Sequence, residues 1–393
     1  MGDDEDLDWI QGQMVGWFDM KVRGRIGDGK RDQGEMVVLG RTIKWCEWGL
    51  EYKADGGHRE KLMKMFGFEG NTSGAATTGE RENEEGEEEL GKPEAKEYRG
   101  GVALLNYYAQ DCPEMQFPAK EASRDMAKPK PRSWGKLKRA VRFAVGRKAV
   151  VWKFELQEEG QELTVVTDSD WGGSREERKS TSGGAVMYGS HCWRTWASTQ
   201  GAVALSSAEA EFYAMVDGAL KGKWARTLAE EVGVVVGGER IIVKVDSEAA
   251  KSFVGRRGLG RMRHIEVRDL WLQEEVRNGK VKVEKILGTE NPAELMTKCL
   301  KKCEVIKRLG GLGIEWREKE EVMKEKVEEK SSWADLHEEE EREGKLEEVW
   351  IEVVSGWKKK VEEVRKKAEE EMRRAAEEVR KPYRWLRRRG EEK

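Results

Sequence analysis

The middle of the chain, from residue 156 to residue 312, changes repeatedly between two hydrophobic patterns. Short apolar runs typical of strands lie at 163–168, 184–188, 192–197, 240–246 and 280–287. Gly189 and Ser190 separate the second and third runs, which predicts a hairpin. Helical patterns cover 206–231, a segment after 246, 264–277 and a final segment from about 292. This order predicts an α/β domain over 156–312.

The segments before residue 156 show weaker patterns. Residues 1–68 predict a short α/β piece, with strands over 36–40 and 42–45 and a short helix from His58 to Phe66. Residues 69–97 pass from small polar residues into a glutamate-rich block, and a stretch of this kind buries too little apolar surface to order itself. We therefore predict an acidic disordered linker there.

Residues 98–155 resume a helical pattern, and Lys128 to Lys148 within them is dense in lysine and arginine. Trp134 and Phe143 are interleaved with these basic residues. Two interpretations remain open for this basic connection-like segment. One is a solvated helix face, and the other is contact with a nucleic-acid backbone.

Residues 313–393 are expected to form a charged helical tail. Its apolar residues from Val353 to Val379 recur with an 11-residue repeat, close to 3.67 residues per turn, which does not favour a left-handed coiled coil. We expect a solvated or loosely docked single helix, with residues 345–380 available to a protein partner.

Composition changes this picture in three ways. Charged residues make up 38% of the 393 residues and hydrophobic ones 37%, so part of the chain should be solvated. The formal net charge is −3, so any binding of nucleic acid must rest on local basic residues. The chain has no apolar stretch near the ~18 residues of a membrane span, and its N-terminus is acidic, unlike a signal peptide. Its five cysteines are scattered without a CxxC, which fits a reducing compartment. A cytoplasmic or nuclear protein is expected.

Four acidic residues are candidates for one metal site: Asp168, Glu211, Asp246 and Glu294. Asp168 and Asp246 end apolar strands, and the two glutamates lie on predicted helices. Ser206 and Glu209 have the spacing of a capping box, which assigns Glu209 to the helix start and leaves Glu211 to point elsewhere. Carboxylates from separate elements suit hard divalent cations used in phosphodiester cleavage.

Each of these residues also has a structural interpretation. Asp168 and Asp246 could be turn formers at strand ends, and Glu294 could complement a helix dipole. Asp170 rivals Asp168, although Asp168 follows the apolar strand directly. His264 is expected to face a packed helix surface or a phosphate rather than to act as a general base.

Several short motifs resemble the ribonuclease H domain of copia-type retrotransposon polyproteins, over about residues 160–302. They are Asp168-Ser169-Asp170-Trp171-Gly172, Arg178-Lys179-Ser180-Thr181-Ser182-Gly183, Ala204-Leu205-Ser206-Ser207-Ala208-Glu209-Ala210-Glu211-Phe212, His264-Ile265-Glu266-Val267-Arg268 and Ala293-Glu294-Leu295-Met296-Thr297-Lys298. The resemblance implies a ribonuclease H-like fold, which is a mixed five-stranded sheet flanked by helices.

A weaker resemblance extends upstream. Residues 18–21, 39–40 and 58–67 are similar to the tail of a reverse transcriptase domain, and this resemblance implies that 1–68 is a partial reverse-transcriptase remnant. The Tyr-x-Asp-Asp turn of such polymerases is missing from this sequence, so DNA synthesis is not expected. Nothing past residue 313 has a counterpart in the resemblance.

The resemblance also implies an activity. Asp168, Glu211, Asp246 and Glu294 would hold two Mg²⁺ ions, with Mn²⁺ expected to substitute, for endonucleolytic hydrolysis of the RNA strand of an RNA–DNA hybrid. The hybrid would be recognised by its shape and by RNA 2′-hydroxyls. Candidates for nucleic-acid contact are Ser206, Ser207, Arg256, Arg257, Arg261, Arg263 and His264.

The last ligand position departs from the family, which usually has aspartate where this chain has Glu294. The extra methylene moves the carboxylate by about 1.5 Å, a displacement that can cost about 100-fold in a tuned site. The sequence alone therefore predicts that Glu294→Asp raises activity. It also leaves a second function open, in which a weakened or inactive element remnant acts as a nucleic-acid-binding or scaffold protein.

Overall fold

The computed structural model describes residues 4–30, 32–68, 72–79, 88–147, 149–174, 177–260, 265 and 270–318. The chain divides into a compact unit over Met1–Glu321 and a second unit over Val322–Lys393. The second unit lies outside the described residues, and so does the predicted partner-binding segment 345–380.

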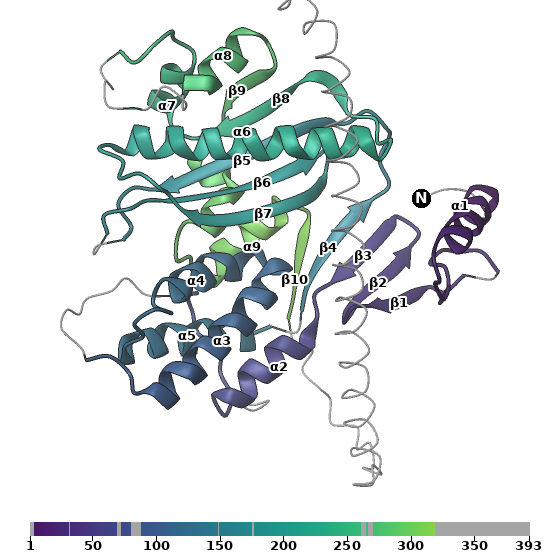
Figure 1. Ribbon diagram of the computed structural model, residues 1–393, viewed down its shortest axis with the longest axis horizontal. Coiled ribbons are helices and arrows are strands. Elements are labelled where there is room, and N and C mark those ends of the chain that lie inside the picture. The colour runs from purple at the N-terminus through teal and green to yellow at the C-terminus, as the bar shows by residue number, and fades with distance from the viewer. Residues whose placement is uncertain are drawn as a thin grey trace, which may run out of the picture. The chain divides into compact units, whose positions relative to one another are not determined.

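A mixed five-stranded sheet organises the middle of the chain, in the spatial order β7-β6-β5-β8-β9 (Figure 1). Neighbours among β5, β6 and β7 are antiparallel, whereas β5, β8 and β9 run parallel. The bounds are β5 (Glu162–Asp170), β6 (Thr181–Tyr188), β7 (His191–Thr199), β8 (Gly237–Val245) and β9 (Val281–Lys285). Tyr188 pairs with His191 across the predicted hairpin. The predicted fold class, a mixed five-stranded sheet flanked by helices, is confirmed.

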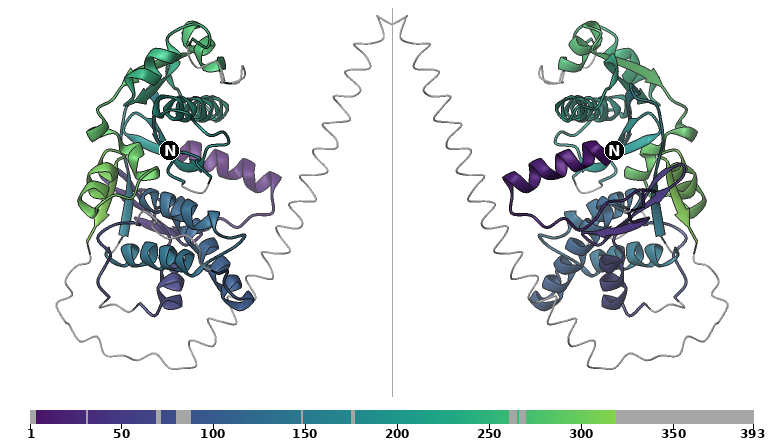
Figure 2. Two further views of the ribbon diagram at one scale, coloured as in Figure 1. Left: turned by 90° about the vertical axis from the view of Figure 1, so that its left-hand side faces the viewer. Right: turned by 90° about the vertical axis from the view of Figure 1, so that its right-hand side faces the viewer.

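One face of this sheet is covered by α6 (Ser207–Glu231), the teal helix seen nearly end-on in Figure 2. Two glycines let the helix approach closely. A Cβ on Gly218 would lie 2.5 Å from Thr167 Cγ2, and one on Gly222 would lie 2.7 Å from Val165 Cγ2. No helix in the described ranges is both long enough and apolar enough to cross a membrane. The short helices α7 (Glu248–Val254) and α8 (Trp271–Arg277) follow β8.

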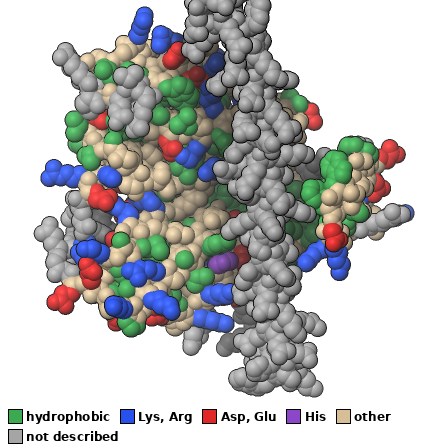
Figure 3. Space-filling model, in the orientation of Figure 1, with side chains coloured by type: hydrophobic (Ala, Val, Ile, Leu, Met, Phe, Trp, Pro, Cys, Tyr) green, Lys and Arg blue, Asp and Glu red, His purple; other side chains and the backbone are tan. Residues whose placement is uncertain are grey.

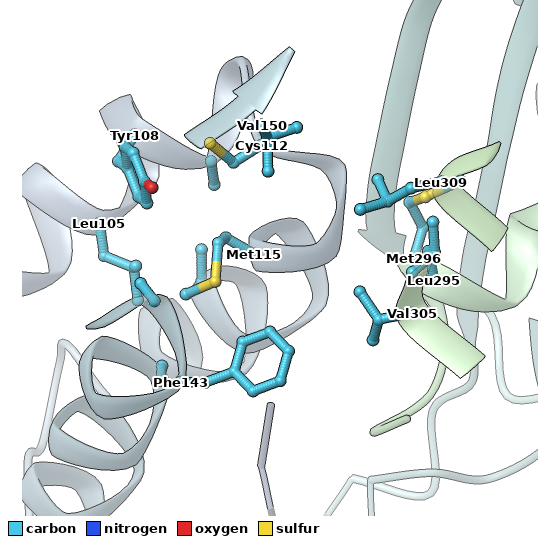
Figure 4. Packing of buried hydrophobic residues seen from close by; sticks show 14 of the residues in the cluster. Leu105, Tyr108, Cys112, Met115, Phe143, Val150, Leu295, Met296, Val305 and Leu309 are labelled. Atoms are coloured by element: carbon cyan, nitrogen blue, oxygen red, sulfur yellow. The ribbon is translucent and has the colours of Figure 1, made fainter. Parts of the chain in front are cut away.

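The other face packs against helices from two distant parts of the sequence. Upstream of the sheet lie α3 (Lys92–Gln110), α4 (Pro113–Arg124) and α5 (Pro131–Val145), and downstream lie the 3₁₀ helices η2 (Gly288–Glu290) and η3 (Pro292–Met296) and the helix α9 (Lys302–Gly310). Their buried residues form one core with Val166 and Ala185 of the sheet. Figure 4 shows residues of α3–α5 on one side and Leu295, Met296, Val305 and Leu309 on the other. The helices α3, α4 and α5, called the connection helices below, therefore share a hydrophobic core with the sheet.

A second, antiparallel sheet joins the two ends of this unit in the order β1-β2-β3-β4-β10. Its strands are β1 (Glu35–Val38), β2 (Arg41–Cys46), β3 (Gly49–Lys53), β4 (Ala149–Glu155) and β10 (Ile314–Arg317), and the helices nearby in sequence are α1 (Asp4–Trp17) and α2 (Gly56–Met65). The expectation that residues 313–393 are helical is wrong at the start of this range, where Ile314–Arg317 form the strand β10. Ile314 and Trp316 alternate as buried residues, and Ile314 pairs with Trp152.

Three further expectations differ from the structure. The segment over 98–155 is not helical throughout, because its last 7 residues form β4, where buried Val150 and Trp152 pair with β10. The predicted linker over 69–97 overlaps α3, which begins at Lys92 because Ala95 and Tyr98 enter the core, and Thr77 in the same range bridges to Lys301. The predicted final helix from about 292 is split into η3 and α9. The step from Leu300 to Val305 is five residues, which breaks the helical period of the buried positions.

Candidate metal and nucleic-acid site

Carboxylates from three elements converge at one end of the mixed sheet. One oxygen each of Asp168 on β5, Glu211 on α6 and Asp246 after β8 lie within 4.8 Å of one another. β5 and β8 are parallel neighbours, so their carboxyl ends meet at the same edge. Asp168 is 1% exposed and Glu211 7% exposed, whereas Asp246 is half-buried. The cluster is thus buried on one side and open at Asp246.

The first turn of α6 leaves Glu211 free to enter the cluster. Ser206 caps the helix by accepting the Glu209 N–H at 3.2 Å, and Glu209 accepts the Leu205 N–H at 2.9 Å. The capping role predicted for Glu209 is therefore confirmed, with Leu205 as the residue it reaches back to.

One oxygen of Glu211 lacks a hydrogen-bond donor. Oε1 accepts the Ser169 N–H at 3.1 Å and the Ser169 hydroxyl at 3.0 Å. Oε2 is buried and has no hydrogen-bond partner within the described residues. A buried carboxylate oxygen of this kind needs a compensating group, and a hard divalent cation is the partner that it fits.

The two aspartates of β5 have different surroundings. Asp170 accepts the Thr181 N–H at 2.5 Å, so it serves the β5–β6 pairing. Asp168 accepts a hydrogen bond from the Thr297 hydroxyl and belongs to the carboxylate group. These contacts favour Asp168 over its rival.

Glu294 is outside the group of three carboxylates. Its Oε1 lies 3.0 Å from Lys298 Nζ, and its Oε2 accepts from Arg308 Nε at 3.1 Å. Lys298 Nζ also lies 3.4 Å from Asp168 Oδ2, so this ammonium bridges the carboxylates of Glu294 and Asp168. The structure brings three of the four candidates together, and the metal-ligand roles remain predictions.

Several residues that support the cluster had no role in the sequence interpretation. Asn291 donates to the Thr167 carbonyl at 2.9 Å and accepts the Ala293 N–H at 3.1 Å, which fixes η3 beside β5. A Cβ on Gly183 would lie 2.7 Å from Met296 Cβ, so glycine is needed where η3 passes β6. Lys298 carried one signal in the sequence, because it follows Glu294 at the i, i+4 spacing of a helical ion pair.

The nucleic-acid candidates divide into three groups. Ser206 uses its hydroxyl for capping, while Ser207 is exposed next to it. Arg256 and Arg257 are exposed at the end of α7. The buried Gln273 anchors this loop by accepting the Gly258 N–H at 2.9 Å and donating to the Phe253 carbonyl at 2.9 Å. Arg261, Arg263 and His264 lie outside the described residues.

The basic segment over 128–148 is largely α5, whose apolar side is buried in the core. Some of its cations make internal contacts: Lys136 lies 3.1 Å from Asp125, and Arg142 donates to the Ser73 carbonyl at 3.1 Å. On the face in Figure 3, lysine and arginine side chains are separated by hydrophobic and neutral surface. These observations favour the solvated-face interpretation.

Burial raises the pKa of the clustered carboxyls. It raises the pKa of Asp168 to about 6, although Lys298 and the Thr297 hydroxyl act in the opposite direction. Burial, followed by repulsion from Asp168 and Asp246, raises the pKa of Glu211 to about 8. The pKa of Asp246 is also raised, mainly by burial. Glu211 therefore keeps a proton near neutral pH when no metal is bound, and a bound cation would displace it.

We expect the metal-free protein to lose stability between pH 6 and pH 8. Folded Glu211 keeps a proton up to a pKa of about 8, whereas the unfolded chain releases it near 4.5. The stabilisation is complete below the lower value and is lost as pH rises through the higher one. Over this interval the loss is about 2 kcal/mol, which thermal unfolding in chelator would detect.

Glu211→Gln is the matched control, because an amide cannot titrate. Its unfolding temperature should vary less between pH 6 and pH 8 than that of the wild type. Equal pH dependence in the two proteins would contradict the raised pKa. Mg²⁺ should stabilise the wild type more at pH 8 than at pH 6, since fewer protons compete with the ion there.

The contacts of Glu294 reverse the effect expected for Glu294→Asp. Shortening this side chain withdraws the carboxylate from Arg308 and Lys298, which both hold it here. Rather than a gain, we expect cleavage to fall by roughly 10-fold, equivalent to about 1.4 kcal/mol in the barrier. Initial rates of hybrid cleavage would measure this. The same change at the exposed Glu290 is the control. Faster cleavage by the Glu294→Asp variant would restore the interpretation based on the sequence alone.

Comparison with known proteins supplies relatives over much of the chain. The retrovirus-related Pol polyprotein from transposon TNT 1-94 of Nicotiana tabacum is 27% identical over 324 residues, covering 77% of this chain and 23% of that protein. The Pol polyprotein from transposon RE2 of Arabidopsis thaliana is 26% identical over 212 residues, covering 53% of this chain and 14% of that protein. This chain spans less than a quarter of the length of these relatives. No protein-family model matches it.

Among solved structures, the N-terminal RNase H domain of rv2228c from Mycobacterium tuberculosis, solved as a fusion with maltose-binding protein, is 18% identical. The match covers 35% of this chain and 91% of the ribonuclease H structure, with a TM-score of 0.22. A score of this size does not by itself establish a common fold. The sequence relatives confirm the resemblance seen in the motifs: the chain is similar to retrovirus-related Pol polyproteins from copia-type plant transposons.

Proposed function

We propose that this chain is a ribonuclease H-type endonuclease that uses divalent metal to hydrolyse the RNA strand of RNA–DNA hybrids. The observation that carries the proposal is the convergence of Asp168, Glu211 and Asp246, with an unpartnered buried oxygen on Glu211. Similarity to Pol polyproteins supports a role in processing the nucleic acid of a transposable element. The motifs around these residues resemble a ribonuclease H domain.

The residues of the cluster have distinct tasks in this proposal. Asp168, Glu211 and Asp246 would hold Mg²⁺, with Mn²⁺ expected to substitute. Bound divalent metal would activate a water for attack on the scissile phosphate and stabilise the leaving 3′ oxygen. Ser169 fixes one oxygen of Glu211, and the Thr297 hydroxyl fixes one oxygen of Asp168, so these carboxylates are oriented before an ion arrives.

Substrate would reach the cluster from the side of the half-buried Asp246. Exposed Ser207, Arg256 and Arg257 are the described candidates for contacts with the backbone. Such contacts position a duplex without reading its sequence, and a hybrid differs from DNA in its shape and 2′-hydroxyls. We therefore expect selection for hybrids with little sequence preference.

The direct test uses the purified full chain with a hybrid carrying a labelled RNA strand. We expect cleavage with Mg²⁺ or Mn²⁺ and none in chelator. Single-stranded RNA and double-stranded DNA of the same sequence should remain intact. Cleavage that survives chelation, or that is equal on single-stranded RNA, would contradict the proposal.

The second candidate function is a weakened or inactive remnant that binds nucleic acid or acts as a scaffold. It is favoured by Glu294, whose oxygens are already engaged by Lys298 and Arg308. Salt-sensitive hybrid binding without cleavage in either metal would support this function instead.

A further inference from the structure

A lysine ammonium lies among the acidic residues of the candidate metal centre. Lys298 Nζ is 3.4 Å from Asp168 Oδ2, 3.5 Å from Asp168 Oδ1 and 3.0 Å from Glu294 Oε1. It therefore bridges the carboxylate at the end of β5 and the carboxylate of η3. A second cation shared by these two carboxylates would need the same space.

Glu294 is held in this arrangement from its other side. Arg308 of α9 donates through Nε to Glu294 Oε2 at 3.1 Å and through Nη2 to the Gly288 carbonyl at 3.1 Å. The arginine is thereby fixed to the backbone before η3 while it binds the carboxylate. Both oxygens of Glu294 are occupied, and neither is free for an ion unless Lys298 moves.

The net charge of six side chains limits the number of ions that the centre can balance. The ionised forms of Asp168, Glu211, Asp246 and Glu294 together carry −4, while Lys298 and Arg308 contribute +2. The remaining −2 equals the charge of one divalent cation. Because uncompensated buried charge is costly in either sign, one divalent ion balances the centre and two would leave it positive.

The carboxylates left for that single ion are the three of the compact group. Glu211 contributes its unpartnered Oε2, and Asp246 is open to solvent. Asp168 retains capacity on Oδ1, since its Oδ2 accepts the Thr297 hydroxyl. Within the described residues, Lys298 Nζ pairs with Asp168 and Glu294, so the ion and the ammonium would share only the carboxylate of Asp168.

We propose that Lys298 replaces the second metal ion, so that this centre binds one divalent cation through Asp168, Glu211 and Asp246. This inference rests on the proposed function and changes the stoichiometry of two that the resemblance implies. The Lys298 side chain is 38% exposed, so its open side can face a substrate phosphate while its buried side faces the carboxylates. A lysine in this place is a positioning residue that supplies fixed positive charge where an ion would otherwise be needed.

The test counts Mn²⁺ bound to the full chain, by calorimetry and by electron paramagnetic resonance. We expect one Mn²⁺ per wild-type chain, with the spectrum of an isolated ion. Lys298→Gln removes the ammonium between Asp168 and Glu294 and frees Glu294 Oε1, so this variant should bind two ions and show the spectrum of a coupled Mn²⁺ pair. Lys298→Arg keeps the charge and should still bind one.

Lys302→Gln is the matched control, because Lys302 is a nearby, similarly exposed lysine that pairs with Glu318 outside the centre. It should bind one ion. A coupled pair in the wild type, or a single ion in Lys298→Gln with native circular dichroism, would overturn the role of Lys298 and leave the proposed nuclease intact. Absence of bound Mn²⁺ from every variant would instead overturn both the inference and the metal-dependent function. Ion counts as expected without any hybrid cleavage would support the inference and count against the nuclease.

Discussion

Asp246→Asn is expected to lower hybrid cleavage by at least about 100-fold, the scale of losing one group that stabilises charge in a transition state. The change removes one negative charge from the group of three carboxylates and leaves the side-chain shape almost unaltered. Asp246 is half-buried at the open side of the cluster, so an amide there should cost the fold little. Single-turnover cleavage with saturating Mg²⁺ measures the effect on the reaction itself.

Asp217→Asn supplies the matched control for this experiment. Asp217 lies on α6, is also half-buried and pairs with Lys221 one turn away, outside the carboxylate group. The same chemical change there should alter cleavage by less than about two-fold, since the Asp217–Lys221 pair is partly exposed and lies outside the carboxylate group. Wild-type activity in Asp246→Asn would remove this residue from the centre. Equal losses in both variants would indicate a general effect of lost charge.

The parts of this fold that the sequence predicts are those with strong local signals. The β6–β7 hairpin follows from Gly189 and Ser190 between two apolar runs, and α6 follows from the capping pair Ser206 and Glu209. The prediction of Asp168 and Glu211 as site candidates rests on signals of the same kind. One ends an apolar strand, and the other is released by a neighbour that caps the helix.

The parts that the sequence does not predict depend on contacts between distant residues. β10 is four residues long, and its identity as a strand rests on pairing with β4, which lies far upstream in the sequence. The contact between Glu294 and Arg308 is not predicted for the same reason. It depends on η3 and α9 being two distinct helices whose packing brings the two side chains together. Local periodicity carries no information about such pairings. Of the two cationic neighbours of Glu294, the sequence signals only Lys298, through the i, i+4 spacing, and gives no signal for Arg308.

A buried ion pair beneath the connection helices should dominate the mutational sensitivity of the core. Arg147, just before β4, pairs with Glu114 of α4, and both side chains are fully buried. Arg147 also donates to the Tyr108 hydroxyl at 2.8 Å and lies 5.1 Å from the centre of the Trp316 ring on β10. This one guanidinium thus contacts α3, α4 and the returning strand β10.

Glu114→Gln is expected to reduce the free energy of unfolding by about 3–5 kcal/mol, because it leaves the arginine charge buried without a counter-charge. The double variant Glu114→Leu/Arg147→Met removes both charges and should be more stable than the single variant, since no uncompensated charge remains. Glu121→Gln on the same helix, which breaks a partly exposed pair with Lys120, should cost less than about 1 kcal/mol. Denaturant unfolding of the four proteins measures these differences. A double variant as unstable as Glu114→Gln would show that packing around Arg147, rather than charge balance, makes this site sensitive.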